Sequence, residues 1–201
     1  MKQFILSKIK KDIKKQYPSY SNEKLDEIMY GVEGLYMTIT KCIIIFTVSI
    51  VLGILKEVLI LLIFFNILRA VGFGMHASNG VVCLISSMVV FLGIAYISNK
   101  LVIKTPIVII TYLICIILYF LFAPSDTKKR PLIKKKKRTI YKVLSITILL
   151  IYLIISLVIK NNLVINCMLF GALIELFLIN PISYKVFKAP YNNYKNYGLD
   201  A

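Results

Sequence analysis

The chain has 201 residues, of which 59% are hydrophobic and 17% are charged, and the charges are gathered in clusters separated by long uncharged runs. A soluble domain needs more polar surface than this, so the composition excludes a soluble globular protein and favours an all-α integral membrane protein. The formal net charge of +16 is explained by basic cytoplasmic loops, and nothing in the chain is typical of a nucleic-acid-binding module.

The first seventeen residues predict a basic amphipathic helix that lies in the interface of an anionic leaflet. Its apolar side chains recur at helical spacing and lysines fill the other positions. The apolar set is Phe4, Ile5, Ile9 and Ile13, and the lysines are Lys8, Lys10, Lys11, Lys14 and Lys15. Pro18 ends this helix, and Ser21 opens a second one.

Six apolar segments follow, each near the length that crosses about 30 Å of hydrocarbon. They cover residues 39–55, 57–75, 81–98, 106–123, 140–159 and 163–180. Asn66 and Arg69 interrupt the second, so a short, broken or re-entrant span is an alternative there. We expect a single membrane domain over 1–201, with interfacial helices in 1–35, a bundle of about six transmembrane helices in 36–183 and a cytoplasmic tail in 184–201.

The distribution of positive charge predicts that both termini of this multi-pass cell-membrane protein are cytoplasmic. One side then holds the N-terminal lysines, Arg69, the run 128–138, Lys185, Lys188 and Lys195, and the other holds Lys56, Lys100, Lys104 and Lys160.

The stretch RAVGFGMHASNGVVC, residues 69–83, contains the only histidine of the chain, His76, and a cysteine seven positions later, Cys83. It forms the cytoplasmic turn between the second and third spans. Cys83 then lies in the first turn of a helix, where the dipole and the backbone amides stabilise a thiolate. A hairpin could bring the imidazole to the thiol, as nucleophilic catalysis requires. The spacing alone is weakly specific, because a capping histidine and a packed cysteine also explain it.

Other polar residues have two interpretations. Arg69 anchors a span at the headgroups or binds a substrate carboxylate, and Glu175 faces the protein interior with a basic partner or stays hydrated near the interface. For the basic run 128–138, topogenesis and lipid binding suffice, and docking of an acidic peptide is the alternative. Asn180-Pro181 ends the last span. The four cysteines show no metal-ligand spacing, so we expect no metal, cofactor or disulfide framework.

Three blocks resemble the accessory gene regulator B (AgrB) family of membrane cysteine endopeptidases, over roughly residues 25–185. The first matches R-x4-G-x-H-A-S-x4-C with Arg69, Gly74, His76, Ala77, Ser78 and Cys83. The second is FAPSDTKKRPLIKKKKR after the fourth span, and the third is Glu175 followed by NPI. The tail YNNYKNYGLDA matches nothing in the family pattern.

The resemblance implies that His76 and Cys83 are the catalytic pair. It implies a substrate propeptide, AgrD-like, with an amphipathic N-terminal helix, a central segment with a cysteine or serine, and an acidic C-terminal tail. Cys83 removes the tail as an acyl-enzyme forms, and the peptide's own thiol then closes a thiolactone. Further candidates for substrate binding or structural support are Arg69, Gly74, Ser78, Glu175, Lys134, Lys135, Lys136 and Lys137. Anionic lipids and a second copy of the chain are the other expected partners.

Two other classes remain open. A small peptide transporter or exporter predicts polar residues along several spans, whereas spans one, three, four and five are almost uniformly apolar. In a non-catalytic membrane scaffold, His76 and Cys83 are replaceable.

Overall fold

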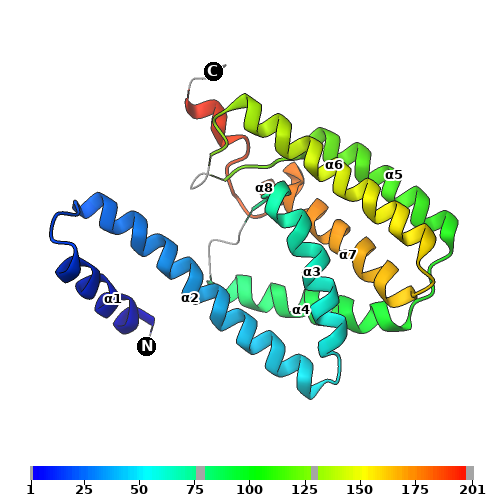
Figure 1. The fold of residues 1–201 in the computed structure, drawn as a ribbon, viewed down its shortest axis with the longest axis horizontal. Coiled ribbons are helices and arrows are strands. Elements are labelled where there is room, and N and C mark those ends of the chain that lie inside the picture. Colours follow the sequence, from blue (N-terminus) through cyan, green and yellow to red (C-terminus); the bar gives the residue numbers. More distant parts are fainter. Residues whose placement is uncertain (1, 76–79, 128–130, 198–201) are drawn as a thin grey trace. The chain divides into compact units, whose positions relative to one another are not determined.

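A computed structural model describes residues 2–75, 80–127 and 131–197. In these residues every regular element is a helix (Figure 1). The chain forms two compact units, residues 1–48 and 49–201, which are described separately.

The first unit contains α1 (Lys2–Gln16) and most of α2 (Asn22–Val51). The ammonium of Lys10 lies 2.6 Å from the carboxylate of Asp26, and the rings of Tyr17 and Tyr20 stack 5.0 Å apart at the turn. Both predicted N-terminal helices are therefore present. The second continues past residue 35 into the first apolar segment and ends at Val51, because no proline interrupts it before that residue.

The second unit is a helical bundle arranged around one central helix. It contains α3 (Leu55–Gly72), α4 (Gly80–Lys100), α5 (Thr105–Phe122), α6 (Lys135–Val158), α7 (Asn162–Ile179), the short α8 (Pro181–Val186) and the 3-10 turn η1 (Asn193–Tyr197). α7 contacts α3, α4, α5 and α6. Within α7, 56% of the residues are buried, against 11–22% in the most apolar stretches of α4, α5 and α6, so α7 is the core of the bundle.

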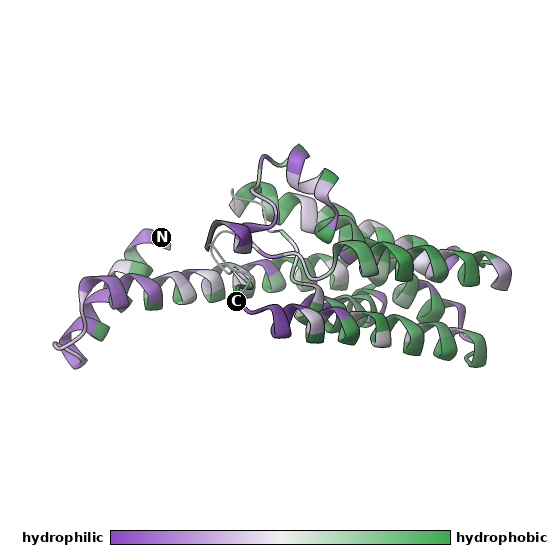
Figure 2. Cartoon of the chain, turned by 90° about the horizontal axis from the view of Figure 1, so that it is seen from above, coloured by the Kyte–Doolittle hydropathy of each residue, from purple (hydrophilic) through white to green (hydrophobic). Residues whose placement is uncertain are grey.

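The lengths and compositions of the helices confirm an all-α multi-pass membrane protein. In the described residues, α2, α4, α5, α6 and α7 are long and apolar enough to cross a membrane. α3 has 18 residues but carries Lys56, Glu57 and Arg69. It is a continuous helix, although the sequence also allowed a broken span here. Figure 2 shows that the helices of the second unit are mostly hydrophobic, whereas α1 is mostly hydrophilic. Apolar side chains such as Ile114 and Phe120 are exposed, as expected of lipid-facing positions.

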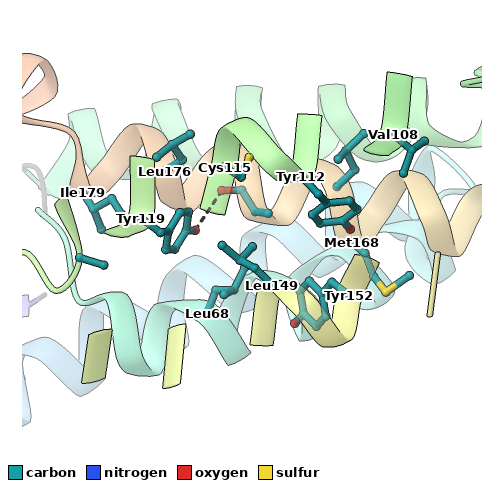
Figure 3. Close-up of a cluster of buried hydrophobic side chains, with 13 residues drawn as sticks. Leu68, Val108, Tyr112, Cys115, Tyr119, Leu149, Tyr152, Met168, Leu176 and Ile179 are labelled. Atoms are coloured by element: carbon teal, nitrogen blue, oxygen red, sulfur yellow. Dashed lines mark hydrogen bonds between the residues drawn. The ribbon is translucent and has the colours of Figure 1, made fainter. Parts of the chain in front are cut away.

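Tyrosines inside the bundle donate hydrogen bonds to the backbone of neighbouring helices. The hydroxyl of Tyr119 in α5 donates to the carbonyl of Ala172 in α7 at 3.0 Å, and Tyr152 in α6 donates to that of Phe64 in α3 at 2.9 Å. Figure 3 shows both rings in the apolar cluster, with the Tyr119 bond dashed. These bonds give the phenol hydroxyls acceptors that the lipid tails do not offer. They also join α5 to α7 and α6 to α3.

The last turn of α4 is held by a side chain of α7. The amide of Asn166 donates to the carbonyls of Ser98 and Leu101 at 2.9 and 2.8 Å. These carbonyls have no partner within α4 because the helix ends there. This end of the bundle is opposite the one that carries the polar residues described next.

Candidate functional site

The turn after α3 has a conformation that few sequences tolerate. Phe73 caps the helix with φ 64° and ψ −85°, and Gly74 follows with φ 65°. A positive φ is strained for a residue with a side chain and easy for glycine. Phe73 stays in this conformation because its ring packs edge-on against Tyr141 of α6, with centroids 4.9 Å apart. The chain therefore leaves α3 toward residue 76 in a defined direction.

Backbone hydrogen bonds fasten this turn to two other segments. The amide of Ser125, from the loop after α5, donates to the carbonyl of Gly72 at 3.0 Å, and the amide of Gly74 donates to the Ser125 carbonyl at 2.9 Å. The amide of Met75 donates to the carbonyl of Leu178 in α7 at 3.0 Å. Three segments far apart in the sequence thus meet at residues 72–75.

Ser125 is itself buried and bonded. Its hydroxyl lies 2.7 Å from the carbonyl of Ile179 at the end of α7 and 2.9 Å from that of Phe122. The phenol of Tyr184 in α8 donates to the carbonyl of Asp126 at 3.0 Å. Burial raises the pKa of Tyr184, so its hydroxyl keeps the donated proton at physiological pH.

An ion pair lies directly beneath the turn. The guanidinium of Arg69 is 3.3 Å from the carboxylate of Glu175, and these side chains are 13% and 0% exposed. The same guanidinium donates to the carbonyls of Gly74 and Met75 at 3.1 and 2.8 Å. Arg69 thereby joins α3, α7 and the residue immediately before His76.

The two glycines of the turn leave no room for a side chain. A Cβ at Gly72 would lie 2.6 Å from Oε1 of Glu175. One at Gly74 would lie 2.5 Å from Nη1 of Arg69 and 2.9 Å from the Leu178 carbonyl. The ion pair is therefore packed against bare backbone.

The predicted site residues other than the four lysines divide into three groups. Arg69, Gly74 and Glu175 come together, which confirms that Glu175 has a basic partner and shows that its hydrated alternative is wrong. Cys83 is half-buried in the first turn of α4, as predicted, and its carbonyl accepts a hydrogen bond from the hydroxyl of Ser87 at 2.6 Å. His76 and Ser78 lie outside the described residues.

The basic run has an exposed part and a structured part. Lys134, Lys135, Lys136 and Lys137 are all exposed at the start of α6. Arg138 instead donates to the carbonyls of Leu132 and Ile133, each at 3.2 Å. The lysines are thus available to a solution or membrane partner.

Sequence reasoning missed the residues that join the segments of the site. Ser125, Asp126 and Tyr184 are polar and almost fully buried there. Ser125 and Asp126 stand inside the FAPSDT block, which was a usable signal, but their partners are mainly backbone groups, which a sequence pattern does not identify.

These features define a class: an all-α, multi-pass membrane protein with a buried ion pair under a polar turn that leads to a histidine and a cysteine. The chain belongs to the accessory gene regulator B family, whose sequence model matches residues 5–179. It is 34% identical to an AgrB-like protein of Clostridium acetobutylicum over 85% of this chain and 82% of that protein. It is 30% identical to an AgrB-like protein of Listeria welshimeri, over 85% of this chain and 84% of that protein. No solved structure was found to match.

Membership of this family supports a role in the accessory gene regulator system, together with an AgrD-like propeptide.

Proposed function

We propose that this protein is a membrane-embedded cysteine endopeptidase that removes the C-terminal tail of a quorum-sensing propeptide and supports its cyclisation. The observation that supports this best is the Arg69–Glu175 pair, which fixes the turn immediately before His76. Cys83 at the start of α4 supplies the thiol. A buried ion pair is costly to desolvate and contributes little net stability, so a positioning role for this pair supports the proposal.

In the proposed reaction, the imidazole of His76 takes the proton of the Cys83 thiol as the sulfur attacks the peptide carbonyl. The carbonyl carbon–nitrogen bond then breaks, and the imidazolium returns the proton to the leaving amine of the tail. The acyl group remains on Cys83 as a thioester. Cys83 lies in the first turn of α4, five residues after Ser78 in the sequence.

Cyclisation follows by exchange of thioesters. The peptide's own cysteine thiolate attacks the acyl carbon, and Cys83 departs as a thiolate that recovers the proton. One thioester replaces another, so the exchange is nearly isoenergetic provided that water is kept from the acyl-enzyme. A site at the edge of the bilayer limits the access of water.

The exposed lysines Lys134–Lys137 attract the acidic tail of the propeptide in this proposal. Attraction between exposed charges is long-range and is weakened by salt. Replacing all four with glutamine should therefore weaken binding of the propeptide at low ionic strength and change it little at high ionic strength. Equal affinity of the two proteins at low salt contradicts this role.

The topology that we propose has both termini in the cytoplasm, with α1 lying on the anionic inner leaflet. The ends of α3, α5 and α7 that meet at the polar turn then face the cytoplasm, where the propeptide is made. Cysteines introduced at Lys135 and at Lys160 of a cysteine-free variant should be labelled by an impermeant reagent from opposite sides of sealed vesicles.

The deciding experiment is mass spectrometry on the protein in anionic liposomes with its cognate propeptide. We expect release of the tail and a product lighter by one water than the linear fragment. Cys83→Ala should abolish both, whereas Cys42→Ala, at a half-buried position in α2, should retain them. Tail release without ring closure limits the protein to proteolysis. Absence of cleavage by folded wild-type protein favours the exporter or the scaffold.

A further inference from the structure

Asp126 is buried, with only 3% of the residue exposed, and its carboxylate binds the C-terminal segment of the chain. Its Oδ1 accepts from the amide of Asn193 at 2.9 Å and its Oδ2 from the amide of Tyr194 at 2.8 Å. The Asn193 side chain donates to the carbonyl of Pro190 at 2.9 Å, which closes the segment on itself. A buried carboxylate is retained only where donors surround it, and here backbone amides supply them.

The same carboxylate binds the stretch that leads into the basic run. Oδ2 of Asp126 also accepts from the amide of Leu132 at 3.3 Å. Arg138 makes a second link between the same two segments. Its guanidinium donates to the carbonyl of Leu132 and lies 3.8 Å from the centre of the Tyr194 ring. Residues 131–138 are therefore bound near one end to Asp126, which also binds the C-terminal segment, and at the other end to Tyr194 of that segment.

The path of this segment is fixed before it reaches Asp126. The ring of Tyr191 packs edge-on against Tyr184 of α8, 5.0 Å between centroids. Asn192 has φ 55°, a conformation that asparagine adopts more readily than most residues. We call residues 189–195 the C-terminal strap. It lies beyond residue 179, where the match to the family ends.

We propose that the C-terminal strap, fastened by Asp126 and Tyr194, orders residues 131–138 and thereby sets the affinity of Lys134–Lys137 for an acidic peptide. This inference rests on the proposed docking of the propeptide tail. A cluster of lysines on an ordered segment binds more tightly than on a mobile one, because less conformational entropy is lost on binding. Asp126 and Tyr194 are positioning residues: they act through the segment and do not touch the peptide.

The test compares strap variants with wild-type full-length protein in nanodiscs, using a fluorescent poly-glutamate peptide as the probe. Asp126→Asn raises the formal charge by one, so electrostatics alone predicts tighter binding, whereas a loosened strap predicts weaker binding. We expect affinity to fall by about fivefold, and hydrogen exchange of residues 131–138 to accelerate by about tenfold. Asp12→Asn, an exposed position in α1, makes the same charge change and should cause neither effect.

Three further variants separate the strap from other causes. Tyr194→Ala removes the ring that covers Arg138, and Tyr194→Phe keeps it, so only the first should behave like Asp126→Asn. Truncation after Ala189 removes one lysine and one aspartate and leaves the formal charge unchanged. It should also loosen the segment. Truncation after Tyr197 removes Asp200 but spares the strap, and it should leave both readouts at wild-type values.

Each outcome is decisive. Unchanged exchange in 131–138, or faster exchange with unchanged or tighter peptide binding, overturns the proposal. If neutralising Lys134–Lys137 leaves wild-type peptide affinity unchanged, the docking role fails, and the exchange measurement still decides whether the strap orders the segment.

Discussion

The guanidinium of Arg69 and the carboxylate of Glu175 lie 3.3 Å apart although 106 residues separate them in the chain. The pair joins the last turn of α3 to the last turns of α7, under the residues that lead to His76. Because Arg69 also donates to the carbonyls of Gly74 and Met75, the loss of either partner should affect the turn as well as the helices.

Breaking this pair from one side should destabilise the protein strongly. Glu175→Gln leaves a buried guanidinium without its counter-charge, and we expect a loss of about 3–5 kcal/mol in the free energy of unfolding. Arg69→Gln should have a similar effect. The double variant should lose less than the sum of the two, since it leaves no unpaired buried charge. Denaturant unfolding in detergent measures all three.

The exposed pair of Lys10 and Asp26 provides the control, because its side chains are 47% and 67% exposed. Asp26→Asn should change the free energy of unfolding by less than about 1 kcal/mol. Additive losses in the Arg69 and Glu175 double variant contradict the coupling.

Adding one methyl group at the turn should abolish processing. Alanine at Gly74 must adopt a positive φ and lie 2.5 Å from the Arg69 guanidinium, and alanine at Gly72 must displace the Glu175 carboxylate. Propeptide cleavage in liposomes is the measurement. Gly93→Ala is the matched control, because a Cβ there meets nothing within 4 Å and alanine favours the helix. Full activity of Gly74→Ala refutes the packing argument.

Removing the hydroxyl of Ser125 should loosen the junction of the α5–α6 loop with α7. Ser125→Ala leaves the buried carbonyl of Ile179 without that donor, and we expect a loss of about 1–3 kcal/mol. Ser145 is buried equally well, but its hydroxyl donates to the carbonyl of Tyr141 within its own helix. Ser145→Ala should therefore have a much smaller effect. Thermal unfolding followed by fluorescence compares the two; equal shifts argue against Ser125 as a junction residue.

Thiol labelling should single out Cys83 among the cysteines of the second unit. Cys115 and Cys167 are fully buried, whereas Cys83 is half-buried at a helix start. We expect a water-soluble iodoacetamide to modify Cys83 at least about tenfold faster than the two buried thiols. Peptide mass spectrometry at short times gives the rates. Comparable labelling of Cys115 or Cys167 contradicts the packing of α5 and α7.

Much of this architecture is predictable from hydrophobic length alone. The six apolar segments correspond to helices, and Asn180-Pro181 ends the last span because proline begins α8 at residue 181. The pairing of Glu175 with a basic residue also follows from its position in an apolar run, because a buried carboxylate needs a partner. The physical cost of a charge in a low-dielectric interior makes such predictions reliable.

The junction at the turn is not predictable in the same way. Ser125, Asp126 and Tyr184 bind main-chain atoms of distant segments, and every residue except proline offers the same main-chain donors and acceptors. The positive φ of Phe73 is likewise imposed by tertiary packing against Tyr141. The tail that begins at Tyr191 resembles no family block, yet Asp126 binds it at Asn193 and Tyr194.

The side-chain amide of Asn166 anchors α4 at the end remote from Cys83. It holds the backbone at Ser98 and Leu101, while Cys83 lies about 22 Å away along the same helix at about 1.5 Å per residue. At that length, a tilt of about 3° about the anchored end displaces the thiol by about 1 Å, and in the proposed reaction such a displacement should lower the rate roughly a hundredfold. If Cys83 is the nucleophile of the proposed reaction, a substitution at the contact of Asn166 with the end of α4 should therefore lower the rate without touching a reacting atom.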